Sequence, residues 1–574
     1  MTGNFNLGPW LVEPGLNAVS RNGARIHLTP KVMGVLVCLA QNAGEPVSKE
    51  TLLQTVWPDT FVGDDVLKVS VSDLRRVLED DAHEPRFIQT IPKRGYRLLA
   101  PVDAVEQTAL AASVSRDSVV VLPFINVSAD PEDEFFADGI TEEIINALAQ
   151  IKELRVVARS SAFSFKGKHI DPRLVGEQLK VRTVLEGSVR RAGNHLRITA
   201  QLVSALDGYH LWSERYDREL KEVFEIQDEI ARSIAERLKV TLEGEREPLV
   251  KAGTQNLEAY QLYVKGRAML YRRGPAFPAT LDLFKKAVSF DPEYALAWAG
   301  MADAYTLSSF YGFMPPEATR PKWLEAANRA VAADATLAEA HAALALGTLF
   351  FEWDKRRAER EFLHALELNP GYIQARAWYA IFFLQAAVGR LPEGVEHAKL
   401  ALEPDPLSCY AHCVMGLTSA GAGRYSEAVL SSQRAVELDP GSFLARWTLQ
   451  SVLYFNGQLQ ESVAAGQAAL AMSGRHPGSI ATLALVLADL GRMTEAEAVY
   501  AELMARARQE YMPPSTLVTA AAAAQEPDAV RHARDVLAIR DPFSCLILSS
   551  HWPYGRRVRR NSCIDQTLRA GGID

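Results

Sequence analysis

The chain has 574 residues, which at roughly 150 residues per domain corresponds to about three or four folded units. Its formal net charge is −8, and its 48% hydrophobic and 23% charged residues argue against a disordered or fibrous protein. Five cysteines argue against a disulfide framework, and no apolar run reaches the roughly 18 residues of a membrane helix. We expect a cytoplasmic protein with no membrane partner.

The first hundred residues predict a compact sequence of strands and helices. Residues 5–28 alternate apolar and polar side chains around a turn signal at Arg21–Gly23, which indicates paired strands. Helices are expected at 30–44, 48–57 and 64–79. The signals for their starts are Pro30 in the first turn of the first helix, Ser48 as the cap of the second, and two acidic residues at the N-terminus of the third. Residues 86–101 predict a β-hairpin that turns at 92–95. This order, over residues 1–102, is that of a winged helix-turn-helix.

The third expected helix has two chemically different faces. Its buried stripe is predicted at positions that follow helical spacing, namely Leu67, Val71, Leu74 and Leu78. The opposite side is polar and basic, which suits the major groove of DNA, and the hairpin turn adds two cations for phosphate or the minor groove. Asp73 departs from this pattern. The candidate DNA-contacting residues are Lys68, Ser70, Ser72, Arg75, Arg76, Lys93 and Arg94.

These segments resemble a known DNA-binding family. Residues 28–57, 66–80 and 88–98 resemble the C-terminal DNA-binding domain of the OmpR/PhoB response regulators, as used at the N-terminus of ToxR- and CadC-like activators. The resemblance implies that the candidates from 68 to 76 occupy recognition-helix positions and that Lys93 and Arg94 occupy the wing. A receiver domain with its phospho-accepting aspartate and a transmembrane helix are both missing, so we expect no phosphorelay control.

Residues 103–117 are interpreted as a polar linker, and residues 118–245 predict an α/β domain. Strands are expected at 118–124, 155–159 and, as two or three more, within 183–217, with a turn at Gly193. Helices are expected at 138–151, 171–181 and 220–242. Residues 121–124, 135–148, 184–203 and 210–231 resemble the TolB N-terminal-like domain, which precedes tetratricopeptide repeats in bacterial regulators and some adenylate-cyclase chains. The resemblance supplies no catalytic residues.

An internal repeat organises the C-terminal half. Glycines recur every 34 residues, and each is followed four residues later by a glutamate, at Gly389, Gly423, Gly457 and Gly491. This period and the residues around it resemble the tetratricopeptide repeat over about 255–540, in which pairs of helices stack into an all-α superhelix with a concave groove for peptides or proteins. Trp298, Trp378 and Trp447 lie on apolar stripes and are interpreted as packing residues.

Several other features have a structural interpretation. The segment 541–574 is expected to form an amphipathic capping helix with a solvated arginine face at Arg556, Arg557, Arg559 and Arg560. The acidic residues between 130 and 143 are interpreted as a solvated loop and helix start rather than a metal site. Cys409, His412 and Cys413 are interpreted as packing residues, and Ser160 and Ser161 have no base nearby in sequence. No phosphate-binding loop, HExxH or GxSxG motif is present, so we expect no enzyme, cofactor or metal.

The sequence therefore predicts a multidomain α+β protein: a winged helix-turn-helix, a small α/β domain and a tetratricopeptide superhelix. The function expected is that of a sequence-specific transcriptional regulator whose repeats bind a protein, peptide or small-molecule signal. Its expected partners are double-stranded DNA, RNA polymerase, a ligand of the repeat groove and a second copy of the chain on DNA. The alternative is a repeat-based scaffold or adaptor whose winged helix binds protein.

Overall fold

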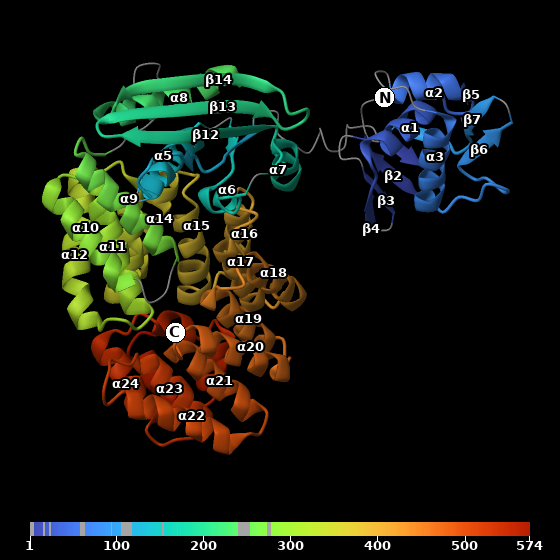
Figure 1. Cartoon of the computed structure of the whole chain (residues 1–574). Coiled ribbons are helices and arrows are strands. Elements are labelled where there is room, and N and C mark those ends of the chain that lie inside the picture. Colours follow the sequence, from blue (N-terminus) through green and yellow to red (C-terminus); the bar gives the residue numbers. More distant parts are fainter. Residues whose placement is uncertain are drawn as a thin grey trace. The chain divides into compact units, whose positions relative to one another are not determined.

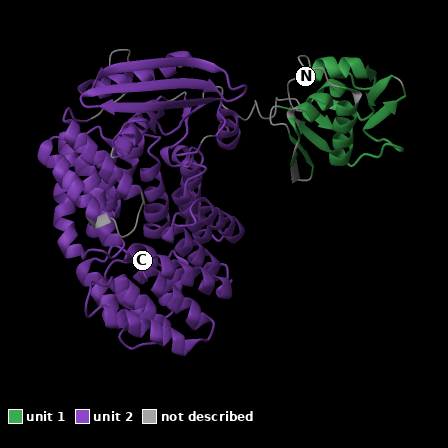
Figure 2. Ribbon diagram, in the orientation of Figure 1, with its two compact units in different colours: residues 1–115 green, residues 116–574 purple. Residues whose placement is uncertain are grey.

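A computed structural model describes residues 5–14, 18–21, 24–57, 63–92, 94–104, 118–131, 133–151, 154–168, 170–238, 253–272 and 277–573. The chain divides into two compact units, residues 1–115 and 116–574 (Figure 2). Each unit has its own hydrophobic core. None of the helices in the described part of the chain combines the length and the apolar composition that a bilayer crossing requires.

The first unit has the predicted order of strands and helices. Its helices are α1 (Pro30–Gln41), α2 (Lys49–Val56) and α3 (Asp64–Leu78). One antiparallel sheet has the order β4-β3-β2-β1-β8, from β1 (Phe5–Leu7), β2 (Trp10–Glu13), β3 (Ala18–Arg21), β4 (Ala24–His27) and β8 (Val102–Ala104). A second sheet has the order β5-β7-β6, from β5 (Pro46–Ser48), β6 (Ile88–Ile91) and β7 (Gly95–Leu98). Strand β5, which anchors the terminal hairpin, was not predicted.

Local chemistry explains where these helices begin. The Thr29 hydroxyl accepts a hydrogen bond from the Val32 N–H at 3.3 Å, and the Ser48 hydroxyl accepts one from the Thr51 N–H at 3.0 Å. Helix α3 starts after Gly63 without a side-chain cap. Its buried side is the predicted apolar stripe, whose four side chains are at most 1% exposed: Leu67, Val71, Leu74 and Leu78. Some positions of the predicted elements lie outside the described residues, namely the turn at Asn22–Gly23 and residues 58, 93 and 105–117.

The second unit begins with a mixed sheet of order β11-β9-β12-β13-β14 (Figure 1). Its strands are β9 (Ser118–Val121), β10 (Ile125–Asn126), β11 (Arg155–Val156), β12 (Thr183–Ala192), β13 (His195–Ser204) and β14 (His210–Glu219). β9 runs parallel to β11 and β12, and the last three strands are antiparallel. The helices are α5 (Asp133–Ala149), α6 (Arg159–Phe163), α7 (Pro172–Leu179), η2 (Leu220–Glu222) and α8 (Val223–Arg237). The strand expected at 155–159 is shorter, and α6 follows it.

The helical pairs predicted by the 34-residue period are present and form what we call the repeat array. Gly389, Gly423, Gly457 and Gly491 all have φ between 70° and 78°, and a new helix begins two residues after each. The first helices are α9 (Leu257–Arg272), α10 (Phe277–Phe290), α11 (Ala295–Phe310), α12 (Pro316–Ala333), α13 (Ala338–Gly347) and α14 (Lys355–Leu368). Next come α15 (Ile373–Trp378), α16 (Leu391–Leu402), α17 (Cys409–Gly421), α18 (Tyr425–Leu438), α19 (Phe443–Phe455) and α20 (Leu459–Met472). The last are α21 (Pro477–Asp489), α22 (Met493–Arg506), α23 (Pro514–Ala523) and α24 (Ala529–Ile539).

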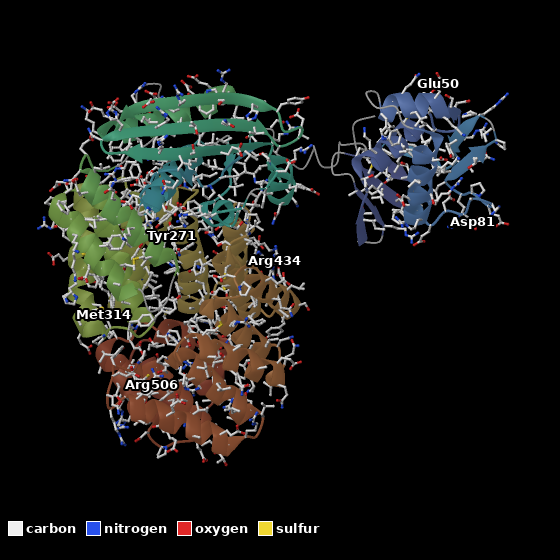
Figure 3. The ribbon with its side chains drawn as sticks, in the orientation of Figure 1. Glu50, Asp81, Tyr271, Met314, Arg434 and Arg506 are labelled. Atoms are coloured by element: carbon white, nitrogen blue, oxygen red, sulfur yellow. The ribbon has the colours of Figure 1, made fainter. Side chains whose placement is uncertain are left out.

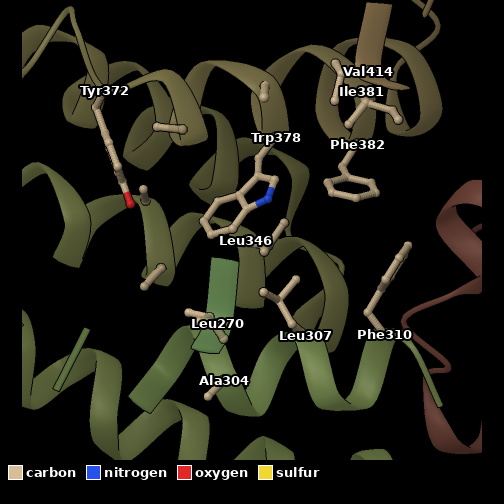
Figure 4. Close-up of a cluster of buried hydrophobic side chains, with 14 of the residues drawn as sticks. Leu270, Ala304, Leu307, Phe310, Leu346, Tyr372, Trp378, Ile381, Phe382 and Val414 are labelled. Atoms are coloured by element: carbon tan, nitrogen blue, oxygen red, sulfur yellow. The ribbon is translucent and has the colours of Figure 1, made fainter. Parts of the chain in front are cut away.

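Two repeat helices widen into π-helical turns, which the period did not predict. α13 continues into η3 (Thr348–Glu352) and α15 into η4 (Tyr379–Ala387). The large side chains of these segments pack together with α11, and Figure 4 shows Phe310, Leu307, Trp378 and Phe382 in one apolar cluster. Trp378 is 1% exposed and Trp447 is 7% exposed, so both are packing residues as predicted. Trp298 is partly buried against the core.

The C-terminal segment differs from the expected single capping helix. Residues 541–573, which we call the tail, form three short helices, α25 (Ser544–Ile547), α26 (Pro553–Val558) and α27 (Ser562–Ala570). Arg559 is buried and donates to the carbonyl oxygens of Leu548 and Ile573, so it is not part of a solvated face. Arg557 forms an ion pair with Asp489 at 2.7 Å. The physical reason is that the tail packs within the array instead of covering its end.

The α/β part and the repeat array form one unit because the first repeat helix packs under the sheet. The Tyr260 ring on α9 lies edge-on to Phe136 of α5 and to Phe224 of α8. Gly139 permits this approach, since a Cβ there would lie 2.8 Å from a methyl group of Val264. The α/β segment and the repeats, which the sequence divides into two domains, therefore share one compact unit joined by this contact.

Candidate nucleic-acid interface

Helix α3 presents an outward face made mainly of polar side chains. Lys68, Ser72 and Arg76 are exposed on it, and Val69 is 62% exposed between them. Ser70 is 5% exposed, and its hydroxyl donates to the Val66 carbonyl oxygen at 3.0 Å. Of the predicted recognition-helix residues, Ser70 therefore lies on the buried side, because it is two residues away from Ser72 along a helix of 3.6 residues per turn.

Arg75 links α3 to the terminal hairpin. Its guanidinium donates to the Ile88 carbonyl oxygen at 2.7 Å and to the Thr90 hydroxyl at 2.9 Å, both on β6. A planar guanidinium with two acceptors in place has a defined orientation. Arg75 therefore sets the position of the hairpin relative to the recognition helix.

The β6–β7 hairpin occupies the position that the sequence predicts for the wing. Arg94 is exposed at its turn, and Lys93 lies outside the described residues. Gly95 has a φ of 141°, and a Cβ at this position would lie 2.0 Å from the Val47 carbonyl oxygen of β5. Only glycine permits the close approach of β7 to β5, so this residue fixes the base of the wing.

The charges of the α3 face are paired within the helix. Lys68 lies 2.8 Å from an Asp65 carboxylate oxygen, and Arg76 lies 2.8 Å from Asp73. The Lys68 and Arg76 side chains are 58% and 78% exposed, and such solvent-exposed pairs contribute little energy. An anionic partner would therefore displace these carboxylates at low cost. Asp73, the acidic departure in the sequence, is the partner of Arg76.

Residues that might have suggested other chemistry make structural contacts. The described residues contain no group of three or more His, Cys, Asp or Glu side chains arranged to hold a metal ion. His412 hydrogen bonds to the Pro406 carbonyl oxygen and to Ser431, and Cys413 is buried. The Ser161 hydroxyl donates to buried Asp405 at 2.7 Å and accepts from the Leu407 N–H at 2.8 Å. These contacts hold loops in place.

The acidic run of α5 is not a solvated helix start, which corrects the prediction. Asp133 is 7% exposed and pairs with Arg191 at 3.2 Å. Asp138 is also 7% exposed and pairs with Lys166 at 2.6 Å. Burial raises the pKa of Glu143 to about 8, with neighbouring Glu142 and Glu339 adding to the effect. No local pattern in the sequence predicts these ion pairs, because the basic partners lie 28 and 58 residues further along the chain.

The interior of the repeat array is occupied by the tail. Phe543 packs edge-on to Phe310 with ring centroids 5.2 Å apart, and Trp552 is completely buried. The Ser549 hydroxyl donates to the Ala386 carbonyl oxygen at 2.6 Å. The expected peptide groove is therefore filled along these residues by the chain itself.

Comparisons with known proteins agree with the geometry of the first unit. Residues 23–98 match the family described as "Transcriptional regulatory protein, C terminal". The chain is 43% identical over 97 residues to "Transcriptional activator CadC" of Escherichia coli (strain K12), which is 17% of this chain and 19% of that protein. It is 26% identical over 396 residues to "Transcriptional regulator HilA" of Salmonella typhimurium, which is 67% of this chain and 68% of that protein.

A further relative matches a longer segment than CadC does, with higher identity than HilA. The chain is 40% identical over 252 residues to "Putative adenylate cyclase 3" of Rhizobium meliloti, which is 43% of this chain and 42% of that protein. The chain thus covers less than half of the length of this relative and of the CadC protein.

Proposed function

From the premise that residues 23–98 are a winged-helix DNA-binding domain of the OmpR/PhoB type, we propose that the chain is a sequence-specific transcriptional regulator. Helix α3 enters the major groove of double-stranded DNA, and the second unit receives the signal that controls regulation. The observation that carries the proposal is the exposed α3 face beside a wing that Arg75 holds in place.

Each residue of the interface has a defined part in this proposal. Lys68, Ser72 and Arg76 face base edges and phosphates, and Val69 supplies an apolar surface for a thymine methyl group. Arg94 contacts the DNA backbone from the wing, and we assign Lys93 the same part from its sequence position. Arg75 is a positioning residue, and Ser70 supports the helix from below.

The proposal extends to how the protein acts on transcription. Two copies on adjacent half-sites and a contact with RNA polymerase remain expectations that follow from the type of domain. The proposal assigns no catalytic step to the chain.

DNA binding by the intact protein tests the proposal. A site is first selected from random duplexes, and affinity is then measured by fluorescence anisotropy over a range of salt concentrations. We expect Arg76→Ala to cost about 1–3 kcal/mol and to relax sequence preference if it reads a base edge. Arg94→Ala should weaken all sequences evenly and lower the salt slope by about one.

The matched control removes a charge from the second unit. Arg434→Gln on α18 changes the net charge by the same amount, and the Arg434 side chain is exposed in the second unit (Figure 3). It should leave DNA binding unchanged. If Lys68→Ala, Arg76→Ala and Arg94→Ala combined left affinity unaltered, the domain would not bind DNA through this face, and the adaptor alternative would gain support.

A further inference from the structure

The second unit contains a large cavity where the α/β part meets the repeat array. Its volume is about 730 Å³, within the range of sites for small organic ligands. One wall comes from α5, β11 and α6, and the other comes from α9, α15 and α17. Tyr271, near the end of α9, lies where the array approaches the α/β part (Figure 3). The tail fills the array interior, and none of the described tail residues lines this cavity.

The two walls are held in register by buried hydrogen bonds. Asp405 accepts from both the N–H and the hydroxyl of Ser161, at 2.8 and 2.7 Å. The Ala158 N–H donates to the Pro404 carbonyl oxygen at 2.8 Å. These contacts join α6 to the loop before α17 across more than 240 residues of sequence. The cavity therefore exists before a ligand arrives, which reduces the entropic cost of binding.

A pre-oriented guanidinium faces this cavity. The Arg159 guanidinium carbon lies 4.1 Å from the centre of the Phe163 ring and 4.7 Å from the centre of the Tyr271 ring. Its Nε donates to Glu142 at 2.9 Å. Within the described residues its two terminal nitrogens make no hydrogen bond, so they are the donors available to a ligand. The Arg159 side chain is only 19% exposed, and a charge-assisted hydrogen bond is strong in such surroundings.

The charged side chains that line the cavity are mixed in sign: five are acidic and four are basic, namely Asp138, Glu142, Glu339, Asp405 and Asp439 against Arg155, Arg159, Lys166 and Arg267. Glu142 is shared by two guanidinium groups, since Arg267 also approaches it, at 3.6 Å. Burial raises the pKa of Glu339, and it raises that of Glu143 to about 8. Lys166 is already paired with Glu134 and Asp138.

A second cation lies at the same cavity. Arg155 donates to the carbonyl oxygens of Lys180 and Glu403, and it forms no ion pair with the described carboxylates. Apolar surface is provided by Phe135, Ile145 and Tyr372. The cavity thus combines the two terminal nitrogens of Arg159, and a second arginine, with a hydrophobic wall.

We propose that this junction cavity binds a small organic anion, whose carboxylate or phosphate pairs with Arg159 and whose carbon skeleton packs against the aromatic wall. The inference rests on the proposed function, because it identifies the chemical class of the signal that the second unit receives. It places the sensory site at the junction rather than in the repeat groove.

Calorimetric titration of the intact protein tests this site with defined probes. Phenyl phosphate and benzoate distinguish the two anionic groups, and benzyl alcohol is the neutral match. We expect at least one anion to bind at millimolar concentration or below, and benzyl alcohol to bind at least roughly tenfold more weakly. Arg159→Gln should weaken anion binding by roughly tenfold or more, whereas Arg434→Gln should not change it.

A second variant guards against a folding defect in Arg159→Gln. Ala268→Leu on α9 narrows the cavity without removing a charge, and it should also weaken the anion that binds. The proposal is overturned if neither anion binds, or if binding is the same in Arg159→Gln and Ala268→Leu as in the unaltered chain. DNA binding is measured on the same preparations to separate the two proposals. If the unaltered chain binds an anion but no DNA, the proposed regulatory function is refuted. If it binds DNA but neither anion, the proposed anion site is refuted.

Discussion

At the scale of single residues, arginines that are close in sequence differ in their contacts and in their exposure to solvent. Arg75 and Arg76 are neighbours on α3, yet Arg75 is bound to β6 while the Arg76 side chain is 78% exposed. Likewise Arg559 is buried against the tail backbone, whereas Arg556 and Arg560 are exposed. The two neighbours therefore differ in what their guanidinium groups bind: Arg75 binds the backbone of β6, and Arg76 binds the carboxylate of Asp73 on its own helix.

This contrast makes a prediction for the first unit. Arg75→Ala should lower its free energy of unfolding by about 1–3 kcal/mol, because the Ile88 carbonyl and the Thr90 hydroxyl lose a charged donor. Arg76→Ala should change it by no more than about 0.5 kcal/mol. Urea denaturation of residues 1–115, a compact unit by itself, measures both values. Equal stability of the two variants would show that Arg75 does not hold the wing.

At the scale of elements, the tail is part of the core of the repeat array. Its side chains contact helices that are far apart in sequence. The ring centroids of Phe543 and Trp447 lie 5.7 Å apart, and the stacked rings of Tyr454 and Tyr554 have centroids 5.9 Å apart. Early and late repeats of the array are also in contact, since His476 Nε2, just before α21, lies 3.0 Å from the carbonyl oxygen of Tyr311, just after α11. Removing a tail side chain should thus affect the whole array.

Trp552 provides the corresponding test. It is completely buried, so Trp552→Ala should lower the free energy of unfolding of the second unit by about 3–5 kcal/mol. Trp298→Ala is the matched control, and it should cost less because this side chain is only partly buried. Chemical denaturation followed by circular dichroism measures the loss of helix. A Trp552 variant as stable as the unaltered chain would mean that the tail is a removable cover.

At the scale of the whole molecule, residues 116–574 form one compact unit. The α9 helix packs against α5 and α8 through Tyr260, so a cut between the α/β part and the array would expose buried apolar surface. The separable piece is instead residues 1–115. A signal that binds at the junction of the α/β part and the array therefore acts on a single folded body.

Deleting residues 116–574 tests this division. The remaining unit should bind the same DNA in vitro with similar affinity, because its core is complete by itself. Regulation of the target genes in cells should change, as measured by transcript levels. Acetyl phosphate should have no effect on DNA binding by either form. Unchanged regulation by the truncated protein would show that the second unit takes no part in control.

The sequence by itself determined the elements whose signals are local. The three helices and hairpin of the first unit, the buried α3 stripe at Leu67, Val71, Leu74 and Leu78, and the glycines of the 34-residue period were all predicted correctly, because caps, turns and helical spacing act within a few residues. The fold class was confirmed for the same reason. The DNA contacts themselves remain predictions, although the exposed positions of Lys68, Ser72 and Arg76 favour them.

Only the tertiary structure decided which of these residues are available to a partner. The binding of Arg75 to β6, the burial of Ser70, the ion pairs of the α5 carboxylates and the tail inside the array all depend on contacts between distant segments. The cavity at Arg159 arises in the same way, since its walls come from residues that are more than 200 positions apart. Such contacts form when buried surfaces meet on folding, and no local sequence pattern encodes where they will meet.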